Sequence, residues 1–335
     1  MSYRIYGAEE SPYSVKVRSY FRYKGIEHEW IVRSQARIAE FQELAKLPLI
    51  PLVATPQGDA LQDSTPILER IEAAHPEPSI HPSDPALAFL SALVEELGDE
   101  WGNKWMFHLR WKAPADQRSA SHRIARTLQP DADDDAIEAT AAGIAKRMTG
   151  RVWFVGSSPQ TAPAIEASFE EAVAQLEAHL GARDYLFGAR PSFGDFGLWG
   201  QMYELWTDPT PGALLRERAP RTCAWIERML DPSAAPRDGA HGWEEASALL
   251  PTLEPFLARQ AGARFLPWSD ANARAIASAA EEFTVELDGR SWTQKPQKYH
   301  ARSLAALRER HAKARGDAAL DAVLERTGCL RWLAV

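Results

Sequence analysis

The sequence predicts a small α/β domain followed by a larger all-helical domain, and two observations support this prediction. Short β-favouring runs alternate with helical patterns in the first 76 residues, whereas the pattern from Ala86 to about Leu230 is helical. Between these parts, the eleven residues from His75 to Pro85 include four prolines, which excludes a helix or a central strand. The expected parts are an α/β domain (1–76), a linker (77–85), a helical domain (86–240) and a C-terminal segment (241–335).

The α/β domain is predicted to have the element order β-α-β-α-β-β-α. The early strand–helix–strand unit implies a parallel strand pair, and the turn at Pro56–Asp59 implies an antiparallel hairpin. This is a thioredoxin-like arrangement, and Pro51 is the candidate for the cis-proline that begins its third strand. The predicted strands are Tyr3–Tyr6, Glu29–Val32, one that begins at Pro51 in the proline-interrupted apolar run Leu47–Val53, and Leu61–Gln62. The predicted helices are Tyr13–Lys24, Ala36–Leu44 and Thr65–Ala74.

Two helix starts in this domain are suited to holding an anion. Ser11 lies at or beside the N-cap of the first helix, and Pro12 suits its first turn because a missing N–H is harmless there. An N-cap hydroxyl faces the positive end of the helix dipole, where an anion such as a thiolate is stabilised. Asp63 and Ser64 open the third helix, which has Pro66 in its first turn.

The rest of the chain is predicted to be helical except for one hairpin. Ser192 and Asp195 form the Asp variant of a capping box. In the C-terminal segment, Asp288-Gly289 predicts the turn of a hairpin over residues 283–293. The expected helices are 86–111, 115–128, 136–148, 162–180, one that opens at Pro191, 221–230, 242–260, 269–283, 303–314 and 317–327.

The composition excludes several classes of function. A net charge of −8 argues against nucleic acid or anionic lipid as the main partner. Two cysteines, Cys223 and Cys329, cannot form a disulfide scaffold or a Cys-rich metal site, and we expect both to be buried apolar residues. No signal peptide is visible, and no apolar run reaches about 18 residues. We therefore expect a cytoplasmic protein with no metal and no membrane span.

Three motifs together resemble the cytosolic glutathione S-transferase superfamily, and in particular its serine-type bacterial members. Ser11–Arg18 is similar to the S-P-[FY]-x-x-[KR]-V start of the first helix. Ile50–Val53 and Asp63–Leu68 are similar to the V-P-x-L and [ED]-S-x-x-I patterns of the glutathione site, and Pro191–Phe196 resembles the capping box of the helical domain. The order and spacing match over roughly residues 3–230, so the C-terminal segment is an addition to the common pattern.

The resemblance implies a glutathione S-transferase fold, with glutathione as co-substrate. It implies that Ser11 donates a hydrogen bond to the thiolate and that the backbone of Ile50 beside Pro51 pairs with the cysteinyl unit. Asp63 and Ser64 would hold the γ-glutamyl end. Because a free thiol has a pKa of about 8.5, the implied task is to lower that pKa and bring the sulfur to an electrophile.

The sequence leaves two assignments open: the hydroxyl that contacts the thiolate and the cation that binds the glycyl carboxylate. Ser14 competes with Ser11 for the thiolate, whereas Tyr6 is expected to pack in the sheet. The glycyl carboxylate of glutathione requires a cation, and the sequence does not select one. The candidates are Arg33, Arg37 and Lys46.

The electrophile site is expected between the domains, beside the long helix that follows the linker. Trp101, Trp105 and His108 share a face of that helix and, with Tyr13, are the candidate lining residues for an apolar or aromatic substrate. The resemblance also implies a homodimer. The leading function is transferase activity. The alternatives are a glutathione-dependent lyase, dehalogenase or isomerase, or a non-catalytic protein that binds an apolar ligand or a protein partner.

Overall fold

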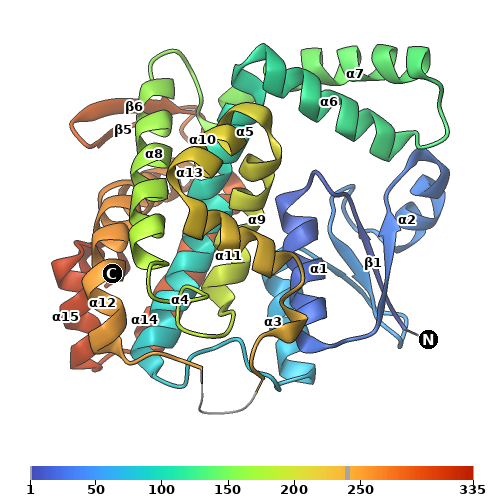
Figure 1. The fold of residues 1–335 in the computed structure, drawn as a ribbon. Coiled ribbons are helices and arrows are strands. Elements are labelled where there is room, and N and C mark those ends of the chain that lie inside the picture. Colours follow the sequence, from blue (N-terminus) through green and yellow to red (C-terminus); the bar gives the residue numbers. More distant parts are fainter. Residues whose placement is uncertain (1, 238–241, 335) are drawn as a thin grey trace.

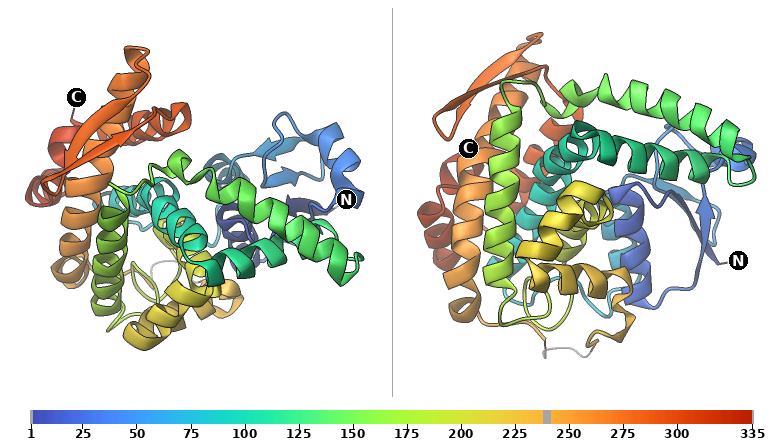
Figure 2. Two further views of the ribbon diagram at one scale, coloured as in Figure 1. Left: turned by 90° about the horizontal axis from the view of Figure 1, so that it is seen from above. Right: turned by 45° about the horizontal axis from the view of Figure 1, so that its top comes forward.

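The computed structural model describes residues 2–237 and 242–334, so the expected boundary at residue 240 lies outside the described residues. A small sheet with its helices lies beside a helical bundle, and the C-terminal segment packs on the bundle (Figure 1). Seen from above, the hairpin of the C-terminal segment lies on the far side of the bundle from the N-terminal sheet (Figure 2). The fold is that of a thioredoxin-like domain joined to a helical domain, as predicted.

The N-terminal sheet has the strand order β2-β1-β3-β4. Its first pair, β1 and β2, is parallel, whereas β3 is antiparallel to both β1 and β4. The predicted parallel pair and the predicted hairpin are therefore both confirmed. The strands are β1 (Tyr3–Gly7), β2 (His28–Val32), β3 (Leu52–Ala54) and β4 (Ala60–Gln62).

Side-chain alternation along the strands places helices on both faces of this sheet. Ile5 and Val53 face the core that contains α1 and α3, whereas Tyr6 and Leu52 face Phe41 of α2. Neighbouring residues on a strand thus belong to different hydrophobic clusters. The helices are α1 (Pro12–Lys24), α2 (Ile38–Leu44), which follows a 3-10 turn at Gln35–Arg37, and α3 (Ser64–Ala74).

The helical domain begins with one long rod rather than one uniform helix. The expected helix over 86–111 consists of α4 (Pro85–Leu97), a π-helical turn at Gly98–Gly102 and α5 (Asn103–Lys112). The sequence did not predict α10 (Pro209–Arg218), because its opening Pro-Thr-Pro-Gly is typical of a turn, although Pro209 suits a first helical turn. The other elements are α6 (Pro114–Leu128), α7 (Asp134–Thr149), a 3-10 turn (Val152–Val155), α8 (Ala162–His179), α9 (Phe193–Thr207), α11 (Pro220–Leu230) and a 3-10 turn (Pro232–Ala234).

Helix α9 is the central helix of this domain, and it begins at the predicted capping box. Ser192 accepts from the backbone of Asp195, and the Asp195 carboxylate accepts from the backbone of Ser192. Two glycines allow α9 to approach its neighbours closely. A Cβ on Gly98 would lie 2.5 Å from the Leu198 nitrogen, and one on Gly200 would lie 2.5 Å from the carbonyl oxygen of Pro12. The close approach at Gly200 brings α9 against the start of α1.

The C-terminal segment shares the core of the helical domain. Its residues Trp268, Trp292 and Leu304 belong to the same buried cluster as Leu93 of α4. The predicted hairpin is confirmed as β5 (Phe283–Leu287) and β6 (Arg290–Gln294), so the expected helix over 269–283 ends earlier, at Ala277. The helices are α12 (Ala246–Phe256), a π-helical stretch (Leu257–Phe265), α13 (Leu266–Ala277), α14 (Lys298–Lys313), α15 (Ala318–Arg326) and α16 (Leu330–Leu333).

Cys223 and Cys329 are buried free cysteines, as expected. In the part of the chain that the structure describes, no helix has the length and apolar character needed to cross a membrane. Within residues 2–237 and 242–334, the His, Cys, Asp and Glu side chains form no group of three that could hold a metal ion.

Candidate functional site

Strand direction brings three chain segments together at one end of the sheet. Tyr6, Leu52 and Gln62 are aligned in register across β1, β3 and β4. Because β3 runs opposite to its two neighbours, the end of β1, the start of β3 and the end of β4 share one edge. Ser11 follows the first of these ends, Ile50-Pro51 precedes the second, and Asp63-Ser64 follows the third. The five predicted glutathione-site residues therefore belong to one edge of the sheet.

Ser11 is the N-cap of α1, with an extended backbone conformation. Its hydroxyl accepts from the Ser14 amide at 3.3 Å and is partly exposed. The rival Ser14 is fully buried, and a Cβ on Gly7 would lie 2.9 Å from the Ser14 Cβ, so Ser14 lies beneath β1. Of the two hydroxyls, only that of Ser11 is open to a ligand at the sheet edge.

The loop that carries Ser11 is held from the helical domain. Tyr203 of α9 donates to Glu9 at 2.8 Å, and Arg110 of α5 donates to the carbonyl oxygen of Glu10 at 3.1 Å. Arg110 is itself fixed by buried ion pairs with Glu204 and Asp208. The position of the α1 N-terminus is thus set by both domains.

Tyr6 is not part of the site. Its hydroxyl donates to Glu40 of α2 at 2.5 Å on the other side of the sheet. Burial and the hydrogen bond to Glu40 raise the pKa of Tyr6 to about 12. The expectation that Tyr6 packs in the sheet is therefore confirmed.

The segment before β3 is fixed by a residue that the sequence did not single out. The Ile50–Pro51 peptide bond is cis, as predicted. The Gln62 amide accepts from the backbone amides of Lys46 and Leu47 and donates to the carbonyl oxygens of Leu47 and Leu49, at 2.8–3.0 Å. Gln62 thereby ties the chain that leads to Ile50 to the end of β4, next to Asp63.

Asp63 and Ser64 open α3 beneath the sheet edge. Asp63 has a φ of 79°, a left-handed conformation that Asp adopts more readily than most residues. Burial raises the pKa of Asp63, and a hydrogen bond from Tyr299 opposes this rise. Ser64 is buried, and its hydroxyl accepts from the Lys16 ammonium at 3.3 Å. The Ser64 hydroxyl is therefore not exposed to a ligand at the start of α3.

Lys16 of α1 is the centre of a buried polar cluster below these residues. Its Nζ lies 2.5 Å from Glu95 Oε1 and 2.7 Å from Asp99 Oδ2, and it donates to Thr65 at 3.2 Å. Burial opposes the charge, but Asp99 and Glu95 outweigh it and raise the pKa of Lys16. The cluster joins α1, the start of α3 and the α4 rod. The sequence feature that could have indicated this cluster is the position of Lys16 one helical turn before Tyr20, which places a cation on the same face of α1 as that apolar residue.

The three candidate cations differ in their surroundings. The Arg33 guanidinium lies over the Phe41 ring at 4.8 Å, and Arg37 forms an ion pair with Glu40 at 2.9 Å. Lys46 is exposed, and its backbone is tied to Gln62 beside Asp63. Of the three candidates, Lys46 is therefore the exposed one that has neither a ring contact nor an ion pair among the described residues.

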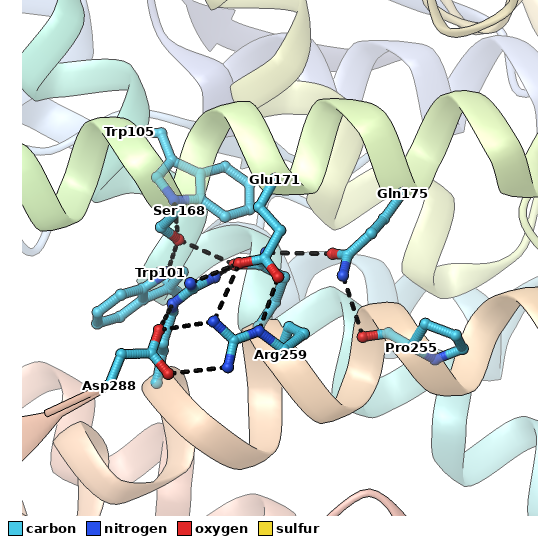
Figure 3. A network of polar contacts seen from close by, with 10 residues as sticks. Trp101, Trp105, Ser168, Glu171, Gln175, Pro255, Arg259 and Asp288 are labelled. Atoms are coloured by element: carbon cyan, nitrogen blue, oxygen red, sulfur yellow. Dashed lines mark hydrogen bonds and ion pairs between the residues drawn. The ribbon is translucent and has the colours of Figure 1, made fainter.

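The expected electrophile wall needs correction. Trp101 and Trp105 are buried and donate to Ser168 of α8 at 3.0 and 2.9 Å (Figure 3). His108 is also buried, between Ser157 and Glu166. These side chains face α8 and the C-terminal segment, which covers the helix face that we expected to line a substrate. They act in packing, and the structure does not bring them to Ser11.

Tyr13 is the one member of that set that lies near the α1 start. Its hydroxyl donates to the Asp99 carbonyl oxygen at 3.1 Å and accepts from Asn103 at 2.8 Å. Tyr13 thus connects the first turn of α1 to the π-helical turn of the rod.

Two cavities lie away from the sheet edge. One of about 440 Å³ is lined by residues that include Gly181 and Arg228, and one of about 310 Å³ by residues that include Trp101 and Trp292. Neither is lined by a residue of the N-terminal domain. We therefore define the candidate site by the sheet edge and not by either cavity.

The fold and this sheet-edge site define a two-domain protein with a thioredoxin-like N-terminal domain. Residues 5–79 match the family model of the glutathione S-transferase N-terminal domain, and residues 131–228 match that of the C-terminal domain. The chain belongs to the cytosolic glutathione S-transferase superfamily, and this membership supports a function that involves glutathione. Both models end before the C-terminal segment.

Solved structures with a similar fold include three bacterial proteins. The β-etherase LigF from Sphingobium sp. strain SYK-6 is 20% identical, with 76% of this chain and 99% of that chain covered and a TM-score of 0.49. A glutathione S-transferase from Methylobacterium radiotolerans in complex with glutathione sulfonate is 20% identical (71% and 97% covered, TM-score 0.43). One from Methylobacillus flagellatus with glutathione bound is 17% identical (70% and 99% covered, TM-score 0.38). A comparison with curated protein sequences found no match.

Proposed function

We propose that the protein is a glutathione transferase that activates the glutathione thiolate for attack on an apolar or aromatic electrophile. The observation that carries this proposal is the meeting of three segments at one sheet edge: the N-cap Ser11, the cis Ile50–Pro51 peptide and the α3 start at Asp63. Family membership supports glutathione as the ligand.

The proposed roles follow from the chemistry of each group. The Ser11 hydroxyl donates to the thiolate at the positive end of α1, which lowers the thiol pKa. The Ile50 backbone pairs with the cysteinyl unit, and Asp63 pairs with the γ-glutamyl amine. Lys46 faces the glycyl carboxylate. Ser64 is bonded to Lys16, so the free amides of the α3 N-terminus carry more of the γ-glutamyl carboxylate than its hydroxyl does.

The reaction requires no group beyond the two substrates. The thiol proton passes to solvent, the sulfur forms a bond to the electrophilic carbon, and the leaving group departs with the bonding electron pair. A serine at position 11 cannot form the mixed disulfide that a cysteine would form, so the proposed chemistry is thiolate attack and not disulfide exchange.

The experiment that tests this function combines binding and turnover. Glutathione is titrated into the protein in a calorimeter, and turnover of a chromogenic chloronitrobenzene is followed with the wild type and with Asp63→Asn. Loss of the charged pair at Asp63 is expected to weaken glutathione binding by about tenfold or more. Asp59→Asn, in the exposed hairpin turn, is the matched control and should bind as the wild type does.

The opposed proposal is a non-catalytic protein that binds an apolar ligand. Binding of an apolar dye without any affinity for glutathione would favour that proposal and contradict the transferase. Glutathione binding with slow turnover of the chloronitrobenzene would instead direct the search to ether cleavage, dehalogenation or isomerisation by the same thiolate.

We further propose a homodimer. Leu47 and Leu49 are 56% and 62% exposed on the loop before Ile50, and they offer apolar surface for a second copy. Light scattering on the wild type and on a Leu47→Lys, Leu49→Lys double variant tests this, with a monomeric double variant as the expected result.

A further inference from the structure

The C-terminal segment reaches the candidate glutathione site through α14. Helix α14 packs against α4 and α13, and its polar side chains contact α3 and the rod formed by α4 and the π-helical turn. Ser303 donates to Glu96, the His300 ring contacts the Glu100 carboxylate, and Arg310 pairs with Glu69 of α3. The family models end at residue 228, so these contacts come from a part of the chain outside the common pattern.

One of these contacts falls on a predicted ligand-binding residue. The Tyr299 hydroxyl donates to Oδ2 of Asp63. The Tyr299 side chain is 50% exposed, so it lies at the surface over which a ligand would approach Asp63. The anchoring contacts of the next residues along α14 fix the helix from which Tyr299 projects.

We infer that Tyr299 completes the amine end of the glutathione site and, with Asp63, determines selectivity for a free γ-glutamyl amine. This inference rests on the proposed function. The Asp63 carboxylate accepts from the Tyr299 hydroxyl at Oδ2 and from the backbone of Ser64, and its two oxygens have further lone pairs for an ammonium group. The phenol oxygen of Tyr299 also retains its lone pairs as acceptors after donating its proton. The pair therefore offers acceptors from both residues to one cation.

The surroundings of the pair also favour a cation. Asp99 and Glu96 act electrostatically on the Asp63 carboxylate as neighbouring acidic groups, and the nearby buried cation, Lys16, is already bonded to Glu95 and Asp99. The family pattern more often has Glu at position 63, and Asp is one methylene shorter. A phenol from the C-terminal segment compensates for this shorter reach by adding a second acceptor.

The test compares two peptides that differ only in the amine. Glutathione and its des-amino analogue, glutaryl-cysteinyl-glycine, are titrated into the wild type and into Tyr299→Phe in a calorimeter. The expected result is a loss of about tenfold in glutathione affinity, because a hydrogen bond to a charged group is removed. The affinity for the des-amino analogue should change by less than about twofold, since it carries no amine for the phenol oxygen to accept from.

A matched control lies one turn further along the same helix. Ser303→Ala removes the contact with Glu96 without touching Asp63, and it should leave the ratio of the two affinities unchanged. Equal losses for both peptides in Tyr299→Phe would overturn the inference, because a merely structural role has that effect. Tighter glutathione binding by Tyr299→Phe would also overturn it, because Tyr299 would then block the site.

The test separates this inference from the proposed function. A wild type that binds neither peptide contradicts the proposed function, and the inference fails with it. A wild type that binds glutathione, together with a Tyr299→Phe protein that keeps the wild-type ratio, contradicts only the inference.

Discussion

The ammonium of Lys16 lies 2.5 Å from Glu95 Oε1, and both side chains are fully buried. This ion pair joins α1 of the N-terminal domain to α4 of the helical domain, directly below the start of α3. It links the two halves of the molecule at the candidate site, and Asp99 at 2.7 Å shares the same cation.

Removal of this cation should be strongly destabilising. Lys16→Met leaves Glu95 and Asp99 buried without their counterion, and the expected loss in the free energy of unfolding is about 3–5 kcal/mol. Urea unfolding at pH 7 measures it. Lys313→Met is the control, because Lys313 is exposed in its pair with Glu309 and should cost less than about 0.5 kcal/mol. Similar losses in the free energy of unfolding for the two variants would contradict the conclusion that the buried ion pair of Lys16 stabilises the fold.

Helix packing predicts opposite outcomes for two glycine substitutions. In Gly98→Ala the new Cβ would meet the backbone of Leu198 at 2.5 Å, so we expect a loss of about 2–3 kcal/mol in the free energy of unfolding. Gly143 lies exposed inside α7, and no other part of the described chain comes within 4 Å of the place that a Cβ would take. Gly143→Ala should therefore stabilise by about 0.5–1 kcal/mol. Chemical denaturation distinguishes the two signs.

His179 gives the protein a predicted sensitivity to acid. Burial lowers the pKa of His179 to about 4, and its ring nitrogens bond Thr252 and the carbonyl oxygen of Leu186. The unfolded chain binds a proton near pH 6.5, whereas the folded one does not. The contribution of this group to stability is therefore complete above about pH 6.5 and is lost as the pH falls toward about 4.

At pH 5 this loss amounts to about 2 kcal/mol. The measurement is urea unfolding of the wild type and of His179→Gln at pH 7 and pH 5. The variant is expected to lose less stability between the two pH values than the wild type does. Equal losses in the two proteins would rule out His179 as the group responsible.

The assignment of Lys46 to the glycyl carboxylate predicts a small, ligand-specific effect. Lys46→Met should weaken glutathione binding by up to about fivefold, the range of an exposed ion pair. Binding of the glycyl amide of glutathione, which lacks this charge, should be unchanged, as should glutathione binding by Lys146→Met on α7. An equal loss for both ligands would contradict this assignment, because the charge of the glycyl carboxylate would then play no part in the effect. No loss for either ligand would point to Arg33 or Arg37 instead.

Local sequence patterns predicted the N-terminal domain well, because its signals are local. Ser11-Pro12 and the turn at Pro56–Asp59 each mark an element boundary through the backbone preferences of a few adjacent residues. The capping box at Ser192 and Asp195 is of the same kind. These signals were sufficient for the parallel pair and the hairpin, whereas the cis bond at Pro51 was predicted from the thioredoxin-like arrangement as a whole.

Long-range contacts could not be predicted in the same way. Trp101 and Trp105 share a helix face, but the sequence does not say whether that face meets a ligand or another helix. Charged contacts such as those of Arg259 with Glu171 and Asp288 hold the C-terminal segment against α8, over that face (Figure 3). Tyr299 was missed for the same reason, since it lies 236 residues from Asp63.

The proposed transferase activity depends on the stabilisation of a glutathione thiolate by Ser11 at the start of α1. The most direct measurement is an ultraviolet titration of bound glutathione against pH, with the wild type, Ser11→Ala and Ser14→Ala. We expect a thiolate band near neutral pH in the wild type and in Ser14→Ala, shifted to higher pH in Ser11→Ala. A band that is unchanged in Ser11→Ala but lost in Ser14→Ala, or no thiolate band in any of the three proteins, would contradict this claim.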